Sequence, residues 1–290
     1  MSRHSTGVPA LDDLLGGGLI PGTLTVVVGA TGIGKTQLGL QFANLGETQE
    51  QHRGIIFDCA SRGDSQSHAE YARRMFDWRL SPMSAEKQVD VDGFFGAEYG
   101  DYLHIFDYHG RRVTRQDLDW DAWRDWQAEL NSRLRAAIAF FYGNFVRGVR
   151  RVVIDGIEPA DRPGESIQFN LFEYIYHQIL RKDPEWVARD LFREAYRRHA
   201  DEASAHLYNS ADIGCLLLYT SRESMLDELI SRPLDEGDVL SNANTLIYMG
   251  KIREGNRIGR GLYIAKHRGS ACDERILEYK IGERGISLLP

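Results

Sequence analysis

The chain has 290 residues, of which 42% are hydrophobic and 27% charged, a composition typical of a globular protein. Its formal net charge of −7 argues against recruitment of nucleic acid or anionic lipid by an overall positive field. Three cysteines (Cys59, Cys215 and Cys272) are too few for a disulfide framework. The first residues do not resemble a signal peptide, so we expect none, and no apolar run approaches about 20 residues. We therefore expect a soluble cytoplasmic protein without a membrane segment.

Apolar runs separated by helical stretches predict an α/β fold with a mostly parallel sheet flanked by helices. The first run, residues 23–29, shows no polar alternation, which favours a strand buried on both faces. A helix is expected at residues 35–45. Further buried strands are predicted at residues 54–58, 151–155 and 213–219.

Two long segments interrupt this pattern, at about residues 62–145 and 160–212. In the first, residues 114–117 resemble a helix start, and apolar residues at 3–4 spacing predict a long amphipathic helix up to the third strand. In the second, one helix is expected before residue 180. Asp183 and Pro184 then predict the N-cap and first residue of another helix.

Short strands are predicted after Ser241, at residues 245–250, 261–266, 275–281 and 286–288. They give the chain a β-rich carboxyl-terminal end. We accordingly predict a single domain over residues 1–290 that carries the two insertions.

The turn between the first strand and the first helix matches the phosphate-binding loop pattern GxxxxGK[ST] in full. Its glycines allow backbone N–H groups to surround a phosphate, and the helix that follows favours anions at its N-terminus. Lys35 would contact the β- and γ-phosphates, and the Thr36 hydroxyl would bind Mg²⁺. The predicted nucleotide-binding residues are Gly29, Ala30, Thr31, Gly32, Ile33, Gly34, Lys35 and Thr36.

The third predicted strand ends in Asp155, which suits a Walker B carboxylate facing the water shell of Mg²⁺. Thr36 and Asp155 are therefore the candidate metal ligands. Glu158 is an optional second acid at this position, with a surface role as the alternative.

Both ends of the chain resemble the KaiC-like branch of the RecA-like P-loop ATPases. Residues 6–19, followed by Pro21 and Gly22, are similar to the segment that precedes the phosphate-loop strand in that family. Residues 264–270 are similar to its closing K-x-R-G strand, and residues 220–223 resemble a sensor-like strand end. The two insertions lie outside this resemblance.

The resemblance implies a RecA-like core that binds ATP and Mg²⁺ and assembles into a ring or filament, often a hexamer, with ATP at the subunit interface. Lys266 and Arg268 match the basic residues that reach the γ-phosphate of the neighbouring subunit. Independently, residues 250–268 contain six Lys or Arg against one acid, which suggests a nearby anion. A solvated hairpin face is the alternative. The candidate catalytic residues are Lys35, Asp155, Lys266 and Arg268.

The sequence departs from the family at the catalytic glutamate that usually follows the second strand. That position falls on Ala60 or Ser61, and neither side chain is a general base near neutral pH. Asp58, whose offset suggests that it points elsewhere, and Glu158 are substitute candidates. We therefore expect hydrolysis to be slow, rerouted or absent, while ATP binding is retained.

The sequence thus favours an ATP-binding, slowly ATP-hydrolysing protein that acts as a homo-oligomer in signalling or regulation, with an unidentified protein partner. One alternative is a recombinase-type DNA-binding ATPase, which the acidic charge and the lack of a basic accessory segment disfavour. Another is a nucleotide-gated scaffold without turnover. An autokinase is also compatible with the family, but no residue marks the acceptor.

Overall fold

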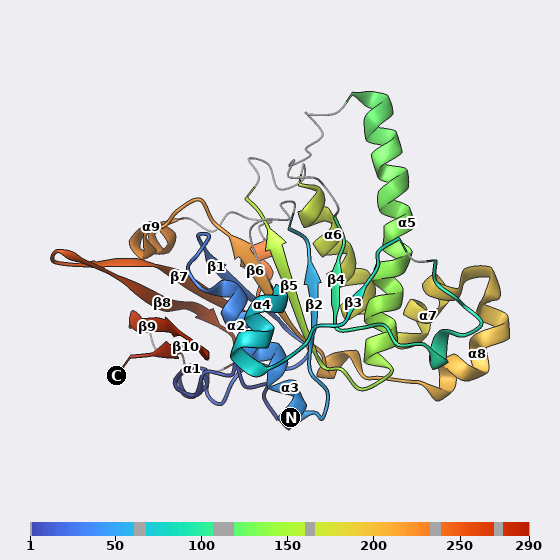
Figure 1. The fold of residues 1–290 in the computed structure, drawn as a ribbon, viewed down its shortest axis with the longest axis horizontal. Coiled ribbons are helices and arrows are strands. Elements are labelled where there is room, and N and C mark those ends of the chain that lie inside the picture. Colours follow the sequence, from blue (N-terminus) through green and yellow to red (C-terminus); the bar gives the residue numbers. More distant parts are fainter. Residues whose placement is uncertain are drawn as a thin grey trace.

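The computed structural model describes residues 2–60, 68–86, 88–106, 119–159, 166–232, 239–269 and 275–289. These residues form a mostly parallel sheet with helices on both faces (Figure 1). The strand order is β10-β9-β8-β7-β1-β6-β5-β2-β4-β3. The predicted class, a RecA-like α/β core with extra strands at the carboxyl-terminal end, is confirmed.

The predicted strands are found to within a few residues, except in the carboxyl-terminal hairpin, where β7 and β8 extend beyond the rest of the sheet (Figure 1). Two further strands, β3 and β4, were not predicted. Strands β1 to β7 pair in parallel, whereas β7 to β10 pair antiparallel. The strands are β1 (Leu24–Gly29), β2 (Ile55–Asp58), β3 (Pro82–Met83), β4 (Tyr102–His104), β5 (Arg151–Ile157), β6 (Gly214–Thr220), β7 (Thr245–Glu254), β8 (Arg257–His267), β9 (Leu277–Gly282) and β10 (Gly285–Leu288).

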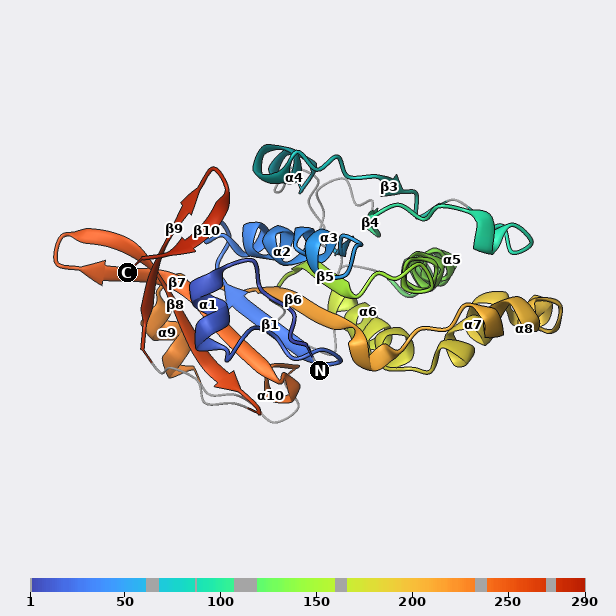
Figure 2. The same cartoon turned by 90° about the horizontal axis from the view of Figure 1, so that it is seen from below.

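Helices cover the sheet from two sides, with α2 and α4 on one face and α6 on the other (Figure 2). The α-helices are α1 (Pro9–Leu14), α2 (Lys35–Asn44), α3 (Gly46–Gln49), α4 (His68–Phe76), α5 (Trp120–Phe145), α6 (Ile167–Ile175), α7 (Pro184–Phe192), α8 (Tyr196–Ala205), α9 (Leu226–Ser231) and α10 (Val239–Asn242). Short 3₁₀ turns occur at Phe94–Gly96, Arg193–Ala195 and Ser210–Asp212, and α6 continues into a π-helical turn, η4 (Tyr176–Leu180). None of the helices in the described ranges is both long and apolar enough to cross a membrane.

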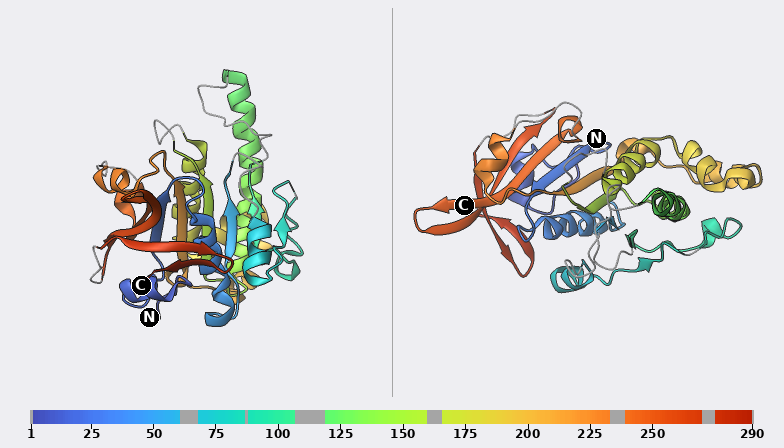
Figure 3. Two further views of the ribbon diagram at one scale, coloured as in Figure 1. Left: turned by 60° about the vertical axis from the view of Figure 1, so that its left-hand side comes forward. Right: turned by 90° about the horizontal axis from the view of Figure 1, so that it is seen from above.

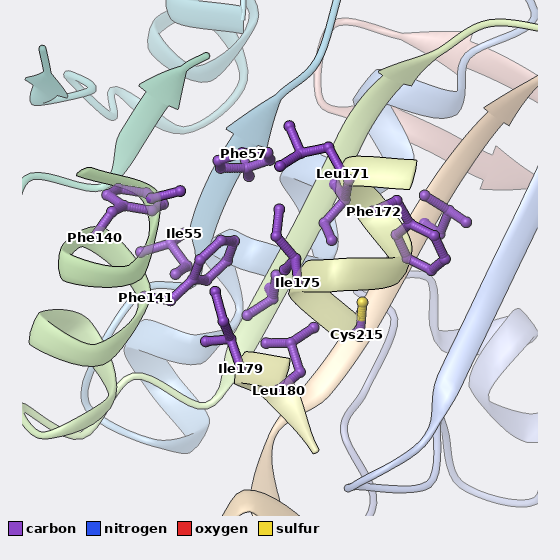
Figure 4. Packing of buried hydrophobic residues seen from close by; sticks show 14 of the residues in the cluster. Ile55, Phe57, Phe140, Phe141, Leu171, Phe172, Ile175, Ile179, Leu180 and Cys215 are labelled. Atoms are coloured by element: carbon purple, nitrogen blue, oxygen red, sulfur yellow. The ribbon is translucent and has the colours of Figure 1, made fainter. Parts of the chain in front are cut away.

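The two faces of the sheet bury separate hydrophobic cores because successive side chains of a strand point to opposite faces. Val26 and Val28 of β1 join the core under α5 and α6, whereas Val27 between them joins the core under α2. Figure 4 shows the first core, where Phe57 of β2 and Phe141 of α5 lie 5.1 Å apart between ring centroids. This two-sided burial explains why the strands lack polar alternation.

The two insertions contribute elements that pack at the β3 end of the sheet. β4 pairs in parallel with β2, and β3 pairs with β4, so both strands continue the sheet. Helix α7 packs against α5 and α8, and α5 rises beyond the other elements (Figure 3). The Asp183 side chain accepts a hydrogen bond from the Glu185 N–H at 2.9 Å, which confirms the predicted N-cap. The predicted helix start at residues 114–117 lies outside the described residues, as do Ser61 and Cys272.

A fully buried arginine ties the start of β5 to the amino-terminal segment. Arg151 donates from Nε to Glu50 Oε2 at 2.8 Å and from another guanidinium nitrogen to the Ser5 and Phe42 carbonyls, and it stacks on the Phe42 ring. Burial would raise the pKa of Glu50, but hydrogen bonds from His4 and Arg151 and their charges hold it below its usual value. The charge of Arg151 is therefore compensated mainly by Glu50.

Glu50→Gln is predicted to lower the free energy of unfolding by about 3 kcal/mol, because it leaves the buried Arg151 without its countercharge. Urea unfolding at pH 7 measures this loss. Because the folded-state pKa of Glu50 is lowered, the difference from wild type should be full at pH 7 and shrink as the pH falls below 4.5. Glu47→Gln is the matched control, since Glu47 pairs with Arg53 on the surface and should cost less than about 1 kcal/mol. Equal losses for the two variants would contradict the assignment.

Candidate functional site

The predicted phosphate-binding loop connects the end of β1 to the start of α2 at Lys35. Gly32 and Gly34 have φ values of +77° and +111°, in the region that glycine adopts readily. The loop leads directly into the N-terminus of a ten-residue helix, with Gly34 as its N-cap. Backbone donors and the helix dipole therefore favour an anion at this place.

Lys35 is buried against the loop that it follows. Only 4% of its surface is exposed, and its Nζ donates to the carbonyl oxygens of Gly29 at 2.8 Å and Ala30 at 3.0 Å. Burial lowers the pKa of Lys35 from 10.5 to about 8, although the charge of Asp155 acts in the opposite direction. The amine thus lies within the loop, where a bound phosphate would stabilise its charged form.

Thr36 and Asp155 lie in contact although 119 residues separate them in the sequence. The Thr36 hydroxyl donates to Asp155 Oδ2 at 2.8 Å, and the Gly156 N–H donates to Asp155 Oδ1 at 2.7 Å. A hydroxyl and a carboxylate are the oxygen donors that Mg²⁺ uses in nucleotide sites, where phosphates and waters supply the remaining ligands. The residues at this position therefore fit the expected magnesium ion.

Asp155 is surrounded by groups that favour its ionised form. Burial would raise its pKa, but the hydrogen bond and charge of His68, with contributions from Lys35 and Thr36, hold the pKa of Asp155 below its usual value. His68 Nε2 lies 3.1 Å from Asp155 Oδ2. Burial lowers the pKa of His68, yet the hydrogen bond to Asp155 and the charges of Asp58 and Asp155 together raise it.

Asp58 and His68 join the site, and the sequence pattern identified only the first of them as a candidate. Asp58 stands in register with Asp155 across β2 and β5, and its Oδ2 lies 3.6 Å from His68 Nδ1. Its carboxylate accepts hydrogen bonds from the Tyr102 hydroxyl at 2.7 Å and the Ala60 N–H at 2.8 Å. Asp58 therefore faces the Asp155 side of the site, whereas the sequence analysis allowed that it points elsewhere.

Ala60, one of the two positions where the family resemblance implies a glutamate, follows directly on this cluster. Its N–H donates to Asp58, and its carbonyl accepts from His104 Nε2 at 2.9 Å. The other candidate position, Ser61, lies outside the described residues. Glu158 follows β5, and its N–H donates to the Gln168 side chain at 3.2 Å.

The structure divides the basic cluster of residues 250–268 between two ends of the sheet. Lys251 and Arg260 line a pocket of about 150 Å³ together with Ala30, Thr31, Gly32 and Ile33 of the loop. At the opposite end, Lys266 Nζ donates to the Ser241 carbonyl at 2.6 Å, and the Arg268 N–H donates to the Asn244 carbonyl. Burial and the charge of Arg268 lower the pKa of Lys266. Within one chain they do not approach the loop, and their action on a neighbouring subunit stays a prediction.

Comparison with known proteins adds the family. The family model described as "ATPase: KaiC" matches residues 4–171, more than half of the chain, and this stretch contains the loop, Asp58 and Asp155. The circadian clock oscillator protein KaiC of Prochlorococcus marinus is 35% identical over 91 residues, which cover 31% of this chain and 16% of that protein. KaiC of Rippkaea orientalis is 33% identical over 87 residues, 30% of this chain and 16% of that protein. The similarity to these relatives thus spans about one sixth of their length.

Lys35→Ala is predicted to abolish most binding of Mg-ATP while the fold stays intact, because it removes the only side-chain cation of the loop itself. For wild type, ATP at 100 times its Kd should stabilise the protein by about 2.7 kcal/mol and raise the melting temperature by several degrees. Lys182→Ala removes an exposed lysine after η4 and should keep this shift. If saturating Mg-ATP does not change the melting temperature of the wild-type protein, the assignment of the loop as a nucleotide site is refuted.

Proposed function

Because the chain belongs to the KaiC family of ATPases, we propose that it binds Mg-ATP at residues 29–36 and hydrolyses it slowly. The observation that carries this proposal is the contact between Thr36 and Asp155, which brings the phosphate loop and the Walker B strand together in a buried site. A Gly-rich turn without a ligand would not require a buried carboxylate beside its threonine.

The proposed reaction is transfer of the γ-phosphoryl group to water, in which the bond to the β,γ-bridging oxygen breaks as the bond to water forms. Loop amides and Lys35 would stabilise the negative charge on the phosphates. Thr36 and Asp155 would hold magnesium, which neutralises charge on the phosphate oxygens when bound. Attack also requires that water be oriented and lose a proton, and Ala60 contributes no carboxylate to this step.

Turnover is therefore predicted to lie well below the median of about 10 s⁻¹ for enzymes. Phosphate release from wild type with Mg-ATP, measured beside Lys35→Ala, tests this rate. Ala60→Glu introduces a carboxylate at one of the two candidate family positions and should increase turnover. Release equal to that of Lys35→Ala would instead indicate a nucleotide-gated scaffold. Turnover at or above the median would mean that another acid, Asp58 or Glu158 first, serves as the base.

We further propose that the protein works as a homo-oligomer in signalling or regulation, with ATP at the subunit interface. Lys266 and Arg268 lie at the end of the sheet opposite to the loop of their own chain, so a γ-phosphate would be within their reach only on a neighbouring subunit. Their match to the K-x-R-G pattern supports the same role.

A mixture of Lys35→Ala and Arg268→Ala subunits is predicted to recover part of the activity that each variant lacks. Some interfaces would combine an intact loop with an intact Arg268. ATP should also favour assembly more than ADP does, because only ATP has the γ-phosphate that these residues would contact. Phosphate release from the mixture and light scattering with each nucleotide measure both effects. A monomer under all conditions, with Arg268→Ala as active as wild type, would leave Arg268 as a solvated surface residue.

A further inference from the structure

His68 is the most buried histidine of the described residues and begins helix α4 beside the candidate magnesium ligands. It is 3% exposed. Its Nε2 approaches the same oxygen, Asp155 Oδ2, that accepts the Thr36 hydroxyl. The imidazole is therefore a direct neighbour of the carboxylate that would hold the metal ion.

The contacts of Asp155 fix which nitrogen of His68 carries the proton. The Asp155 carboxylate accepts from the Thr36 hydroxyl and the Gly156 N–H, and we assign the 3.1 Å contact in the same sense, with His68 Nε2 as the donor. With Thr36 on Oδ2 and Gly156 on Oδ1, this hydrogen bond completes three donors around a carboxylate that is 1% exposed. Without His68, Oδ2 would lose one of its two donors, and the carboxylate would be less firmly oriented.

The other side of the imidazole faces the second strand. Asp58 Oδ2 lies 3.6 Å from Nδ1, beyond hydrogen-bond distance, and Nδ1 has no hydrogen-bond partner among the described residues. Tyr102 donates to that Asp58 oxygen, and its ring lies 5.5 Å from the imidazole between centroids. Asp155 therefore holds the ring through Nε2, and Asp58 and Tyr102 lie next to it.

We propose that His68 is a positioning residue of the nucleotide site, which orients Asp155 through its Nε2–H. This inference rests on the proposed function, because the carboxylate that it orients is the one assigned to magnesium. Outer partners of metal ligands fix the orientation of those ligands, and their loss costs about 10–100-fold in metal affinity or activity.

Two amide variants separate this role from simple filling of the core. In His68→Gln the side-chain nitrogen can take the place of Nε2 and donate to Asp155. In His68→Asn, one methylene shorter, the nitrogen falls near the place of Nδ1 and cannot reach Asp155. Both variants put a polar amide into the same buried space, so a residue that only fills the core should respond to them alike.

The experiment measures binding of a fluorescent ATP analogue to the full chain across a magnesium titration and in EDTA, together with the melting temperature without nucleotide. For His68→Asn, the magnesium concentration that gives half of the maximal gain in affinity for the ATP analogue should rise about 10–100-fold. The affinity for the analogue in EDTA, without magnesium, should change less than about twofold. His68→Gln should recover most of this loss. His177→Asn, an exposed histidine of η4, should behave as wild type.

The outcomes are separable. If wild type does not bind the analogue, the proposed function fails before His68 is tested. If wild type binds but both amide variants keep its magnesium dependence, or lose it equally, His68 has no positioning role. If His68→Asn does not fold, His68→Gln still decides, because a shift of its magnesium dependence by tenfold or more would overturn the proposed donor role.

Discussion

Parallel pairing brings the carboxyl ends of neighbouring strands to one edge of the sheet, and every residue of the candidate site depends on that register. Gly29 at the end of β1 stands opposite Thr220 of β6 and Met249 of β7. Asp58 of β2 stands opposite Asp155 of β5. Since helices cover both faces, the loops at this edge are the place where polar side chains can gather around a ligand.

The gathered side chains include four titratable groups that are almost fully buried, namely Lys35, Asp58, His68 and Asp155, with 4%, 5%, 3% and 1% of their surface exposed. A buried charge without a partner costs several kcal/mol, so such groups persist only where each compensates another. Asp155 contacts His68 and Thr36 directly and attracts Lys35 through its charge. The loop, α4 and the second and fifth strands are consequently coupled electrostatically, and removal of one group changes the surroundings of the others.

The sequence was sufficient to predict the parts of the fold that carry local signals. Uninterrupted apolar runs marked β1, β2, β5 and β6, and a spaced motif marked the loop, because these patterns follow from burial on both faces and from phosphate geometry. β3 and β4 could not be predicted, since two or three residues show no periodicity. His68 lacked a signal for another reason. The rest of α4 mixes charged and apolar residues, and nothing within the helix indicates that its first residue faces a carboxylate 87 residues away.

The basic cluster shows the limit of composition as an argument about a site. The charge count over residues 250–268 suggested that all six basic residues lie near one bound anion. In the antiparallel hairpin of β7 and β8, however, Lys251 and Arg260 lie toward the tip, whereas Lys266 and Arg268 lie at the base. Arg268 lies beside Asn244, five residues from the level of Met249, which corresponds to about 16 Å at 3.3 Å per residue. Lys251 and Arg260 lie beside the loop of their own chain. Lys266 stands level with Val26 in the middle of β1, and Arg268 lies near the level of Leu24, at the end of β1 away from the loop. If the residues at the tip and those at the base both act on phosphates, each hairpin contributes to two nucleotide sites. The smallest assembly that completes one site would then contain two copies of the chain.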